Sequence, residues 1–233
     1  MSAEEYRDGA SVGAAVAAVR ARIAAAASRS GRKVEDITLI AVTKGVSLER
    51  IRAAVAAGIA DLGESRVQEA VPKIAALGAP VRWHLVGYLQ RNKAARAAAL
   101  FEVIHSVDSA ALLAALGRRA LHPLDVLLQV KLAGAGGRHG VPSEALAALA
   151  RQAVGLPGLR VVGLMTIAPP ARDPEAVRTV FRRLRELRGE LGRLIGPLPH
   201  LSMGMSDDFE VAVEEGATMV RIGRAIFGPR NPM

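Results

Sequence analysis

The stretch Ile37-Thr38-Leu39-Ile40-Ala41-Val42-Thr43-Lys44-Gly45 decides the fold of this chain. Its residues up to Thr43 are β-branched or apolar, which is typical of a short strand buried on both faces. The strand ends at Lys44, and a glycine follows it directly. Open α/β sheets and α/β barrels place their chemistry at the carboxyl ends of their strands. The amine of Lys44 is therefore expected at a functional edge.

Two interpretations of Lys44 are open at this point. An amine can form a Schiff base and a guanidinium cannot, and the chain has only five lysines (33, 44, 73, 93 and 131) against a large excess of arginine. The alternative is a lysine that caps a strand and extends its ammonium group into solvent. Lys131 also lies near the end of a predicted strand, but Leu132-Ala133 rather than a turn follows it, so it ranks below Lys44.

Eight apolar runs alternate with helical patterns along the chain. The predicted strands span residues 37–43, 59–63, 81–87, 101–105, 124–132, 159–165, 200–203 and 218–222. An amphipathic helix with Val12, Val16, Val19 and Ile23 on one face precedes them. Pro72 is expected to interrupt the helix after the second strand. This pattern predicts an α/β protein, a single (β/α)8 TIM barrel with an extra N-terminal helix.

One domain is expected over residues 1–233, with flexible ends at 1–9 and 229–233 and a glycine-rich turn at 134–140. The length is at the lower end of the range for a (β/α)8 barrel, and no linker indicates a second domain. A doubly wound open sheet is the alternative. It is disfavoured because no Gly-x-Gly-x-x-Gly turn follows the first strand.

The net charge of +9 and the pI near 10.9 raise the question of nucleic-acid binding. Much of the charge lies in residues 172–193, where arginines share a helical pattern with apolar residues and form its outer face. Aromatic content is 3%, and the one aromatic residue of this stretch, Phe181, belongs to its apolar pattern rather than to the arginine face, where it could stack bases. We therefore expect a solvated helix face and no nucleic-acid partner.

No apolar run approaches the roughly 20 residues of a membrane span, and the N-terminus lacks the layout of a signal peptide. No membrane association is expected, and a cytoplasmic location is the default. The absence of cysteine excludes disulfides and thiolate metal sites. The five histidines are scattered without ligand spacing, so no metal site is predicted. His84 is interpreted as a satisfied core histidine.

The loops after the seventh and eighth predicted strands, 201–207 and 221–224, are candidates for a phosphate site. Ser206 or Asp207 is expected to be the N-cap of the next helix, whose backbone N–H groups attract anions. Gly204 and Gly223 would let backbone approach a ligand closely. When each of these residues is taken singly, ordinary helix capping or turn formation is the better explanation. A phosphate site opposite a lysine at a strand end, however, is the geometry that an aldehyde-bearing phosphate cofactor requires.

Several motifs together resemble the pyridoxal phosphate homeostasis protein family. They are Ala41-Val42-Thr43-Lys44, Gly63-Glu64-Ser65-Arg66-Val67-Gln68-Glu69, residues 83–93 from Trp83-His84-Leu85-Val86-Gly87 to Lys93, His105-Ser106-Val107-Asp108-Ser109, Gly163-Leu164-Met165-Thr166, residues 201–208 and Arg221-Ile222-Gly223. The resemblance runs from about residue 12 to Phe227 in the same order and spacing.

The resemblance implies an alanine-racemase-like, fold-type III barrel that holds pyridoxal 5′-phosphate (PLP) as an aldimine on Lys44. It implies phosphate contacts from the Ser206 and Gly223 loops and Arg221 against the pyridine nitrogen. Ser65 stands where the family usually has Asn, and Arg224 stands where it usually has Thr or Ser. The expected cofactor-binding residues are Lys44, Ser65, Ser202, Met203, Ser206, Arg221, Gly223 and Arg224.

The same resemblance implies a cofactor carrier in PLP homeostasis, with effects on amino-acid and keto-acid balance and without an established catalytic activity. Its partners would be PLP and PLP-dependent apoenzymes, and the chain would be a monomer or weak dimer. A racemase-like PLP enzyme is the alternative. Such an enzyme needs a second acid–base group, a Tyr from an added domain, and this chain has only Tyr6 and Tyr88. A basic nucleic-acid-binding module is the remote third hypothesis.

Overall fold

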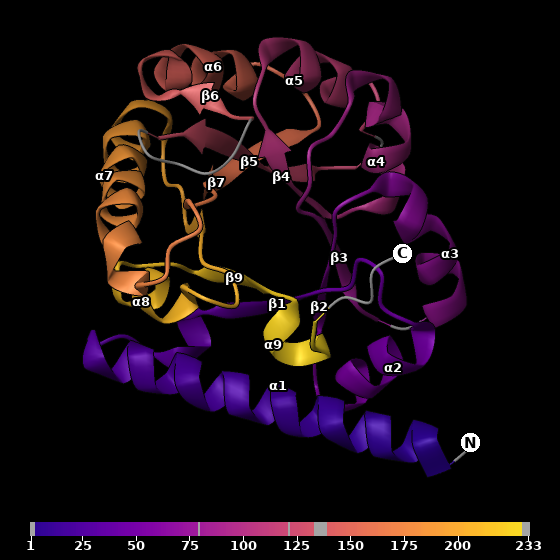
Figure 1. Ribbon diagram of the computed structural model, residues 1–233. Helices are drawn as coiled ribbons and strands as arrows, with labels where there is room; N and C mark the ends of the chain where they lie inside the picture. Colours follow the sequence, from indigo (N-terminus) through magenta and orange to yellow (C-terminus); the bar gives the residue numbers. More distant parts are fainter. Residues whose placement is uncertain (1–2, 79, 121, 133–138, 230–233) are drawn as a thin grey trace.

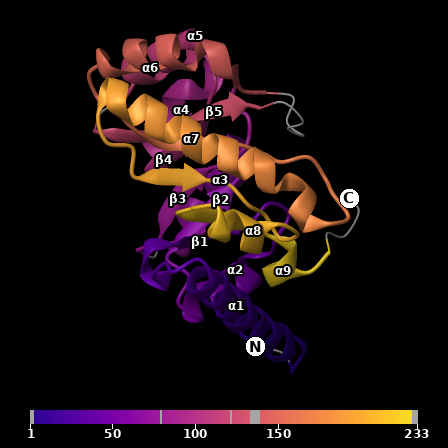
Figure 2. The same cartoon turned by 90° about the vertical axis from the view of Figure 1, so that its left-hand side faces the viewer.

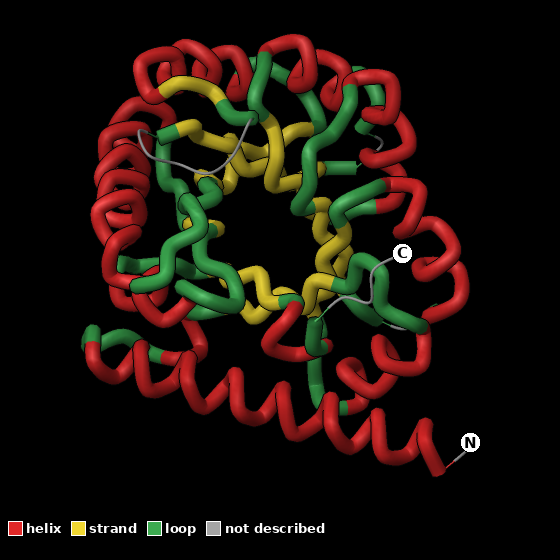
Figure 3. The backbone as a smooth tube through the Cα atoms, in the orientation of Figure 1, coloured by secondary structure: helices red, strands yellow, loops and turns green. Residues whose placement is uncertain are grey.

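The computed structural model describes residues 3–78, 80–120, 122–132 and 139–229, with side chains from Ser11 onward. Strands form an inner ring and helices an outer ring, with α1 lying across one side of the barrel (Figures 1 and 3). The strands are β1 Thr38–Val42, β2 Asp61–Glu64, β3 Arg82–Leu85, β4 Val103–Val107, β5 Leu124–Lys131, β6 Val141–Pro142, β7 Leu159–Met165, β8 His200–Ser202 and β9 Met219–Ile222.

The helices alternate with these strands as the sequence predicts. They are α1 Ala3–Arg29, α2 Leu48–Ala56, α3 Val67–Leu77, α4 Ala94–Leu100, α5 Ala110–Gly117, α6 Leu146–Val154, α7 Arg178–Ile195, α8 Phe209–Glu214 and α9 Arg224–Phe227. Short 3-10 turns at Val34–Asp36, Arg91–Lys93, Ser143–Ala145 and Pro174–Val177 complete the connections.

Eight of the strands close into a parallel barrel in sequence order. β1 pairs with β9 on one side and β2 on the other, and β4 pairs with β5, so no edge is left open in this ring. The two-residue strand β6 adds to β5 outside the ring. The (β/α)8 barrel is confirmed, and the open-sheet alternative is wrong. The predicted glycine-rich turn lies mostly outside the described residues, as do residues 230–233 of the predicted flexible end.

Strand bounds differ most from the prediction at β4, which runs Val103–Val107 rather than 101–105. Phe101 is instead the C-cap residue directly after α4. The polar pair His105-Ser106 looks like a strand end in the sequence, but both side chains are completely buried. The expected interruption at Pro72 is also wrong, because α3 continues through this exposed residue. The carbonyl that its missing N–H leaves without a donor lies in the first turn of the helix.

Helix α1 packs along the outside of the barrel against α2, α8 and α9 (Figure 1). Val12, Val16, Val19 and Ile23 are buried in this contact, as the sequence pattern predicts. The helix begins at Ala3, inside the stretch that was expected to form a flexible end.

The expectation that no run is long and apolar enough to span a membrane needs correction. Residues 11–29 pass that test by length and composition, because alanines raise the mean hydropathy to 1.2. The same stretch includes the valines and isoleucine that pack on the barrel, so the structure uses it as a packing helix.

The arginine-rich helix α7 runs along the side of the barrel (Figure 2). Its apolar side chains Val180, Phe181, Leu184, Leu187 and Leu191 are buried, as predicted. Its arginines pair with carboxylates: Arg178 contacts Glu175, Glu214 and Glu215, and Arg183 contacts Glu186 and Glu190. Much of the positive charge of this segment is therefore matched within the protein itself.

Candidate functional site

Lys44 lies at the mouth of the barrel, in the turn that follows β1 and two residues beyond its last residue, Val42. Alternate residues of a strand share a face, and Ile40 belongs to a small apolar cluster inside the barrel with Val103, Leu127, Met165 and Met219. Lys44 shares the parity of Ile40 and Val42, so its side chain enters a cavity of about 700 Å³ above the barrel interior. Gly45 has φ +69°, which lets the chain turn directly after the lysine.

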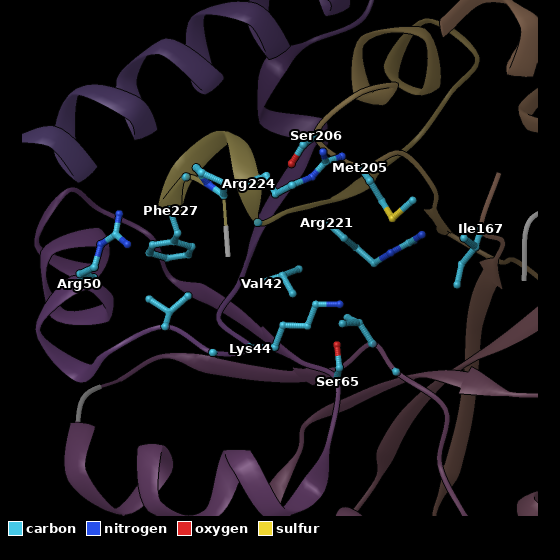
Figure 4. A pocket seen from close by; sticks show the side chains of 17 residues that line it. Val42, Lys44, Arg50, Ser65, Ile167, Met205, Ser206, Arg221, Arg224 and Phe227 are labelled. Atoms are coloured by element: carbon cyan, nitrogen blue, oxygen red, sulfur yellow. The ribbon is translucent and has the colours of Figure 1, made fainter. Parts of the chain in front are cut away.

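Six of the eight expected cofactor-binding residues line this cavity. They are Lys44, Ser65, Ser206, Arg221, Gly223 and Arg224. Figure 4 shows Lys44 and Arg221 reaching into the same space from β1 and β9, with Ser206 and Arg224 beside them. These residues come from strands that are neighbours in the ring, which is why segments 177 residues apart in sequence, such as Lys44 and Arg221, meet here.

The structure does not bring Ser202 and Met203 to the cavity wall. Ser202 points into the barrel and hydrogen-bonds to His105 and Arg221. Met203 has the opposite parity and lies in the main apolar core, completely buried. The sequence identified the loop correctly, but the loop wall at the cavity is made by Met205 and Ser206.

The charged side chains on the cavity wall are all cationic. Lys44, Arg50, Arg221 and Arg224 line it, and no Asp or Glu does so within the part of the chain that the structure describes. Such a concentration of one sign of charge in a concave site favours an anionic ligand. Arg50 on α2 was not among the expected residues, because its place in an ordinary amphipathic helix gives no local signal.

Arg221 is the most deeply buried of these cations. One guanidinium nitrogen, Nη1, donates to Ser202 Oγ at 2.6 Å, and Nη2 donates to the carbonyl of Thr166 at 2.8 Å. Burial lowers the pKa of Arg221 to about 10, so the side chain remains protonated at neutral pH. It is therefore an oriented hydrogen-bond donor that does not release its proton.

The loop after β8 is organised differently from the expected N-cap. Asp208, and not Ser206 or Asp207, occupies the N-cap position of α8, and its carboxylate accepts from the N–H of Met205 at 2.6 Å. Burial raises the pKa of Asp208. Ser206 Oγ instead accepts from the N–H of Ala225 at 3.2 Å, which joins this loop to the first turn of α9.

The same loop also contributes an ion pair and a glycine at the edge of the cavity. Asp207 forms an exposed ion pair with Arg224 at the cavity edge. Gly204 has φ +91°, and a Cβ there would lie 2.6 Å from Ala212. The close approach that this glycine permits is thus to α8 rather than to a ligand.

A buried ion pair supports the backbone just before Lys44. Lys73 Nζ donates to Glu64 Oε1 and to the carbonyl of Thr43, both at 2.6 Å, and Thr43 Oγ1 donates to the same Glu64 oxygen at 2.6 Å. Glu64 is completely buried. Thr43 and Glu64 have the opposite parity from Lys44 and Ser65, so their side chains lie on the other face of the strand ends, where Lys73 of α3 reaches them. The spacing of Thr43, Glu64 and Lys73 in the sequence did not predict this ion pair.

The barrel interior holds a hydrogen-bonded cluster of polar side chains that the sequence did not reveal. His84 is buried and satisfied, as interpreted, but its partners are Asp61 on β2 and His105 on β4. No group of three or more His, Asp or Glu side chains suited to a metal ion occurs among the described residues. Lys131 is exposed at the end of β5 and does not line the cavity.

Comparisons with known proteins give consistent results. The family described as "Alanine racemase, N-terminal domain" matches residues 15–231. A pyridoxal phosphate homeostasis protein of Aquifex aeolicus is 44% identical over 215 residues, covering 90% of this chain and 94% of the relative. One from Pseudomonas aeruginosa is 44% identical over 220 residues, with 93% and 94% covered. PipY of Synechococcus elongatus PCC7942, solved with PLP bound, is 40% identical with a TM-score of 0.79, covering 88% of this chain and all of PipY.

Proposed function

This chain belongs to the pyridoxal phosphate homeostasis proteins, and we propose that it binds PLP in the cavity at the barrel mouth and serves PLP homeostasis. One observation carries the proposal. A single amine, Lys44, enters a cavity whose other charged walls are guanidinium groups and which has no carboxylate among its described lining residues. That combination fits a ligand with both an aldehyde and a phosphate.

The residues present fit this cofactor. The cavity volume of about 700 Å³ lies within the usual range for sites of small organic ligands. When bound, PLP supplies an aldehyde that bonds covalently to an amine. Lys44 would hold that aldehyde carbon. Ser206, Gly223 and Arg224 would hold the phosphate, and Arg221 would face the ring nitrogen.

The permanent positive charge of Arg221 favours storage and delivery of the cofactor over catalysis. A charged guanidinium donates a hydrogen bond to a ring nitrogen but does not protonate it, so the ring stays a poor electron sink. A racemase also needs a second acid–base group. Tyr88 is about half exposed and stacks on His139 with ring centroids 3.8 Å apart, and it does not line the cavity. Tyr6 precedes Ser11, the first residue whose side chain the structure describes.

The wider role follows from these properties. We propose that the protein works in the cytoplasm as a monomer or weak dimer and supplies PLP to PLP-dependent apoenzymes. Nucleic acid is not a proposed partner, because Arg178, Arg182 and Arg183 of α7 form ion pairs with glutamates of the same protein.

Borohydride reduction followed by peptide mapping tests the site. The protein is mixed with PLP, reduced and digested with trypsin. A modified Lys44 resists cleavage, so the PLP mass should appear on the peptide spanning residues 34–50. Lys44→Ala should lose the label, and the matched control Lys131→Ala should keep it. A label on Lys131, or none on the wild type, would contradict the assignment.

A second assay tests the absence of catalysis. The PLP-loaded protein is incubated with amino acids, and racemisation and deamination are followed. We expect no turnover at ordinary enzyme rates. Turnover that Lys44→Ala abolishes would favour the racemase-like alternative instead.

A further inference from the structure

A continuous series of hydrogen bonds crosses the barrel interior and ends on Arg221. Asp61 Oδ1 lies 2.9 Å from His84 Nε2, and His84 Nδ1 lies 2.9 Å from His105 Nε2. His105 Nδ1 lies 2.8 Å from Ser202 Oγ, which accepts from Arg221 Nη1 at 2.6 Å. We call these five residues the interior network. It joins β2, β3 and β4 on one side of the ring to β8 and β9 on the other.

The two ends of the interior network determine the direction of every hydrogen in it. Arg221 can only donate, so Ser202 Oγ accepts from it. The hydroxyl proton of Ser202 then points to His105 Nδ1, the other hydrogen-bond partner of Ser202 Oγ among the described residues, and His105 Nδ1 accepts it. His105 Nε2–H donates to His84 Nδ1, and His84 Nε2–H donates to the carboxylate of Asp61. Each group donates once toward Asp61, and both imidazoles are neutral Nε2–H tautomers.

The reverse direction fails at both ends. If His105 Nδ1 carried the proton, it would compete with Arg221 for the oxygen of Ser202, and the hydroxyl proton would lack an acceptor in the network. A neutral His84 would then present a lone pair to the carboxylate of Asp61, and a protonated His84 would still leave the fault at Ser202. An imidazolium at His105 has the same fault, because its Nδ1–H also points at Ser202.

Burial makes this arrangement costly to disturb. His84, His105 and Ser202 are completely buried, whereas the Asp61 side chain is 17% exposed. Buried polar groups that lose their partners are strongly destabilised, and networks in a low-dielectric interior strengthen their members. Charged or titratable groups near the network include Arg82, whose Nε lies 3.7 Å from Asp61 Oδ1. His200 lies near His105, and Asp208 lies near Arg221.

We infer that Asp61, His84 and His105 are positioning residues, which hold Ser202 as an acceptor for Arg221 and so fix the guanidinium at the cavity. Their role toward PLP rests on the proposed function. The orientation of Arg221 itself does not, since it is a property of the protein without cofactor. The interior network thus connects a carboxylate at the start of β2 to the group that would face the cofactor ring.

Imidazole NMR of the cofactor-free protein tests the first part. Protein labelled with ¹⁵N-histidine is measured near neutral pH, and the signals are assigned with His84→Gln and His105→Gln. Both residues should be neutral Nε2–H tautomers. An Nδ1–H tautomer or an imidazolium at His105 would overturn the inference, whether or not the protein binds PLP.

PLP titration of variants tests the second part, with affinity and the absorbance maximum of the bound cofactor as readouts. His105→Leu removes the hydrogen bonds of His105 to His84 and to Ser202. PLP binding should weaken by about tenfold, as expected for a lost hydrogen bond to a charged group, and the absorbance maximum of the bound cofactor should shift. His105→Gln has an amide that can accept from Ser202 and donate to His84, so it should stay within about threefold. His200→Gln, a partly buried histidine outside the network, is the control.

The outcomes separate the two proposals. A folded His105→Leu with wild-type affinity and absorbance would overturn the positioning role. If this variant does not fold, Ser202→Ala breaks the same link to Arg221 and is judged by the same readouts. A wild-type protein that takes up no PLP would contradict the proposed function, and the histidine tautomers would then decide the interior network alone.

Discussion

Mild acid should destabilise this protein through His105, and replacing that residue should remove the effect. Complete burial is the largest cause that lowers the pKa of His105 well below its ordinary value of 6.5, and the positive charge of Arg221 acts in the same direction. As pH falls through 6.5, the unfolded chain therefore binds a proton that the folded protein does not. The stability that neutral His105 permits above pH 6.5 is lost progressively below it.

The size of the effect follows from proton linkage. One proton bound only by the unfolded chain changes the free energy of unfolding by about 1.4 kcal/mol per pH unit below the unfolded pKa. Between pH 7.5 and pH 5.5 the loss from His105 should be about 1.4 kcal/mol, provided the imidazole stays neutral in the folded state. His200 contributes in the same direction, because burial lowers its pKa as well.

Urea unfolding at the two pH values measures this difference. His105→Gln cannot titrate in this range and should lose about 1.4 kcal/mol less than the wild type on going from pH 7.5 to pH 5.5. His122→Gln, at an exposed position, is the control for replacing a histidine. An equal loss in the wild type and in His105→Gln would refute the reasoning, since it would mean that folded His105 takes up the proton.

Three further predictions concern the supports of the site. Lys73→Met leaves the buried carboxylate of Glu64 without its cation and should cost about 3 kcal/mol in urea unfolding, whereas adding Glu64→Gln should recover much of the loss. Arg178→Ala should cost about 1 kcal/mol at pH 7. That cost should fade as pH drops below 4.5, because hydrogen bonds from Arg178 lower the pKa of Glu214; an undiminished cost in acid would contradict this. Arg224→Thr removes a cation from the rim and should weaken PLP binding about threefold at low ionic strength and less at high salt, as PLP titration at both would show.

The sequence by itself determined the alternation of strands and helices and the position of Lys44 at the end of β1. These features depend on local periodicity and on residues adjacent in the chain, such as Thr43-Lys44-Gly45. The same reasoning identified the amphipathic faces of α1 and α7, whose apolar residues are buried as expected. It also located the two loops, after β8 and β9, that form one side of the cavity.

Only the tertiary structure decided which side chains of those segments reach the cavity. Ser202 turns into the barrel and Met203 into the core because strand register and alternation fix their directions, and register depends on neighbouring strands. The partners of His105 lie 21 and 97 residues away, so no local pattern could join them. Closure of the ring brings these distant strands face to face, and it is this closure that connects Arg221 to Asp61.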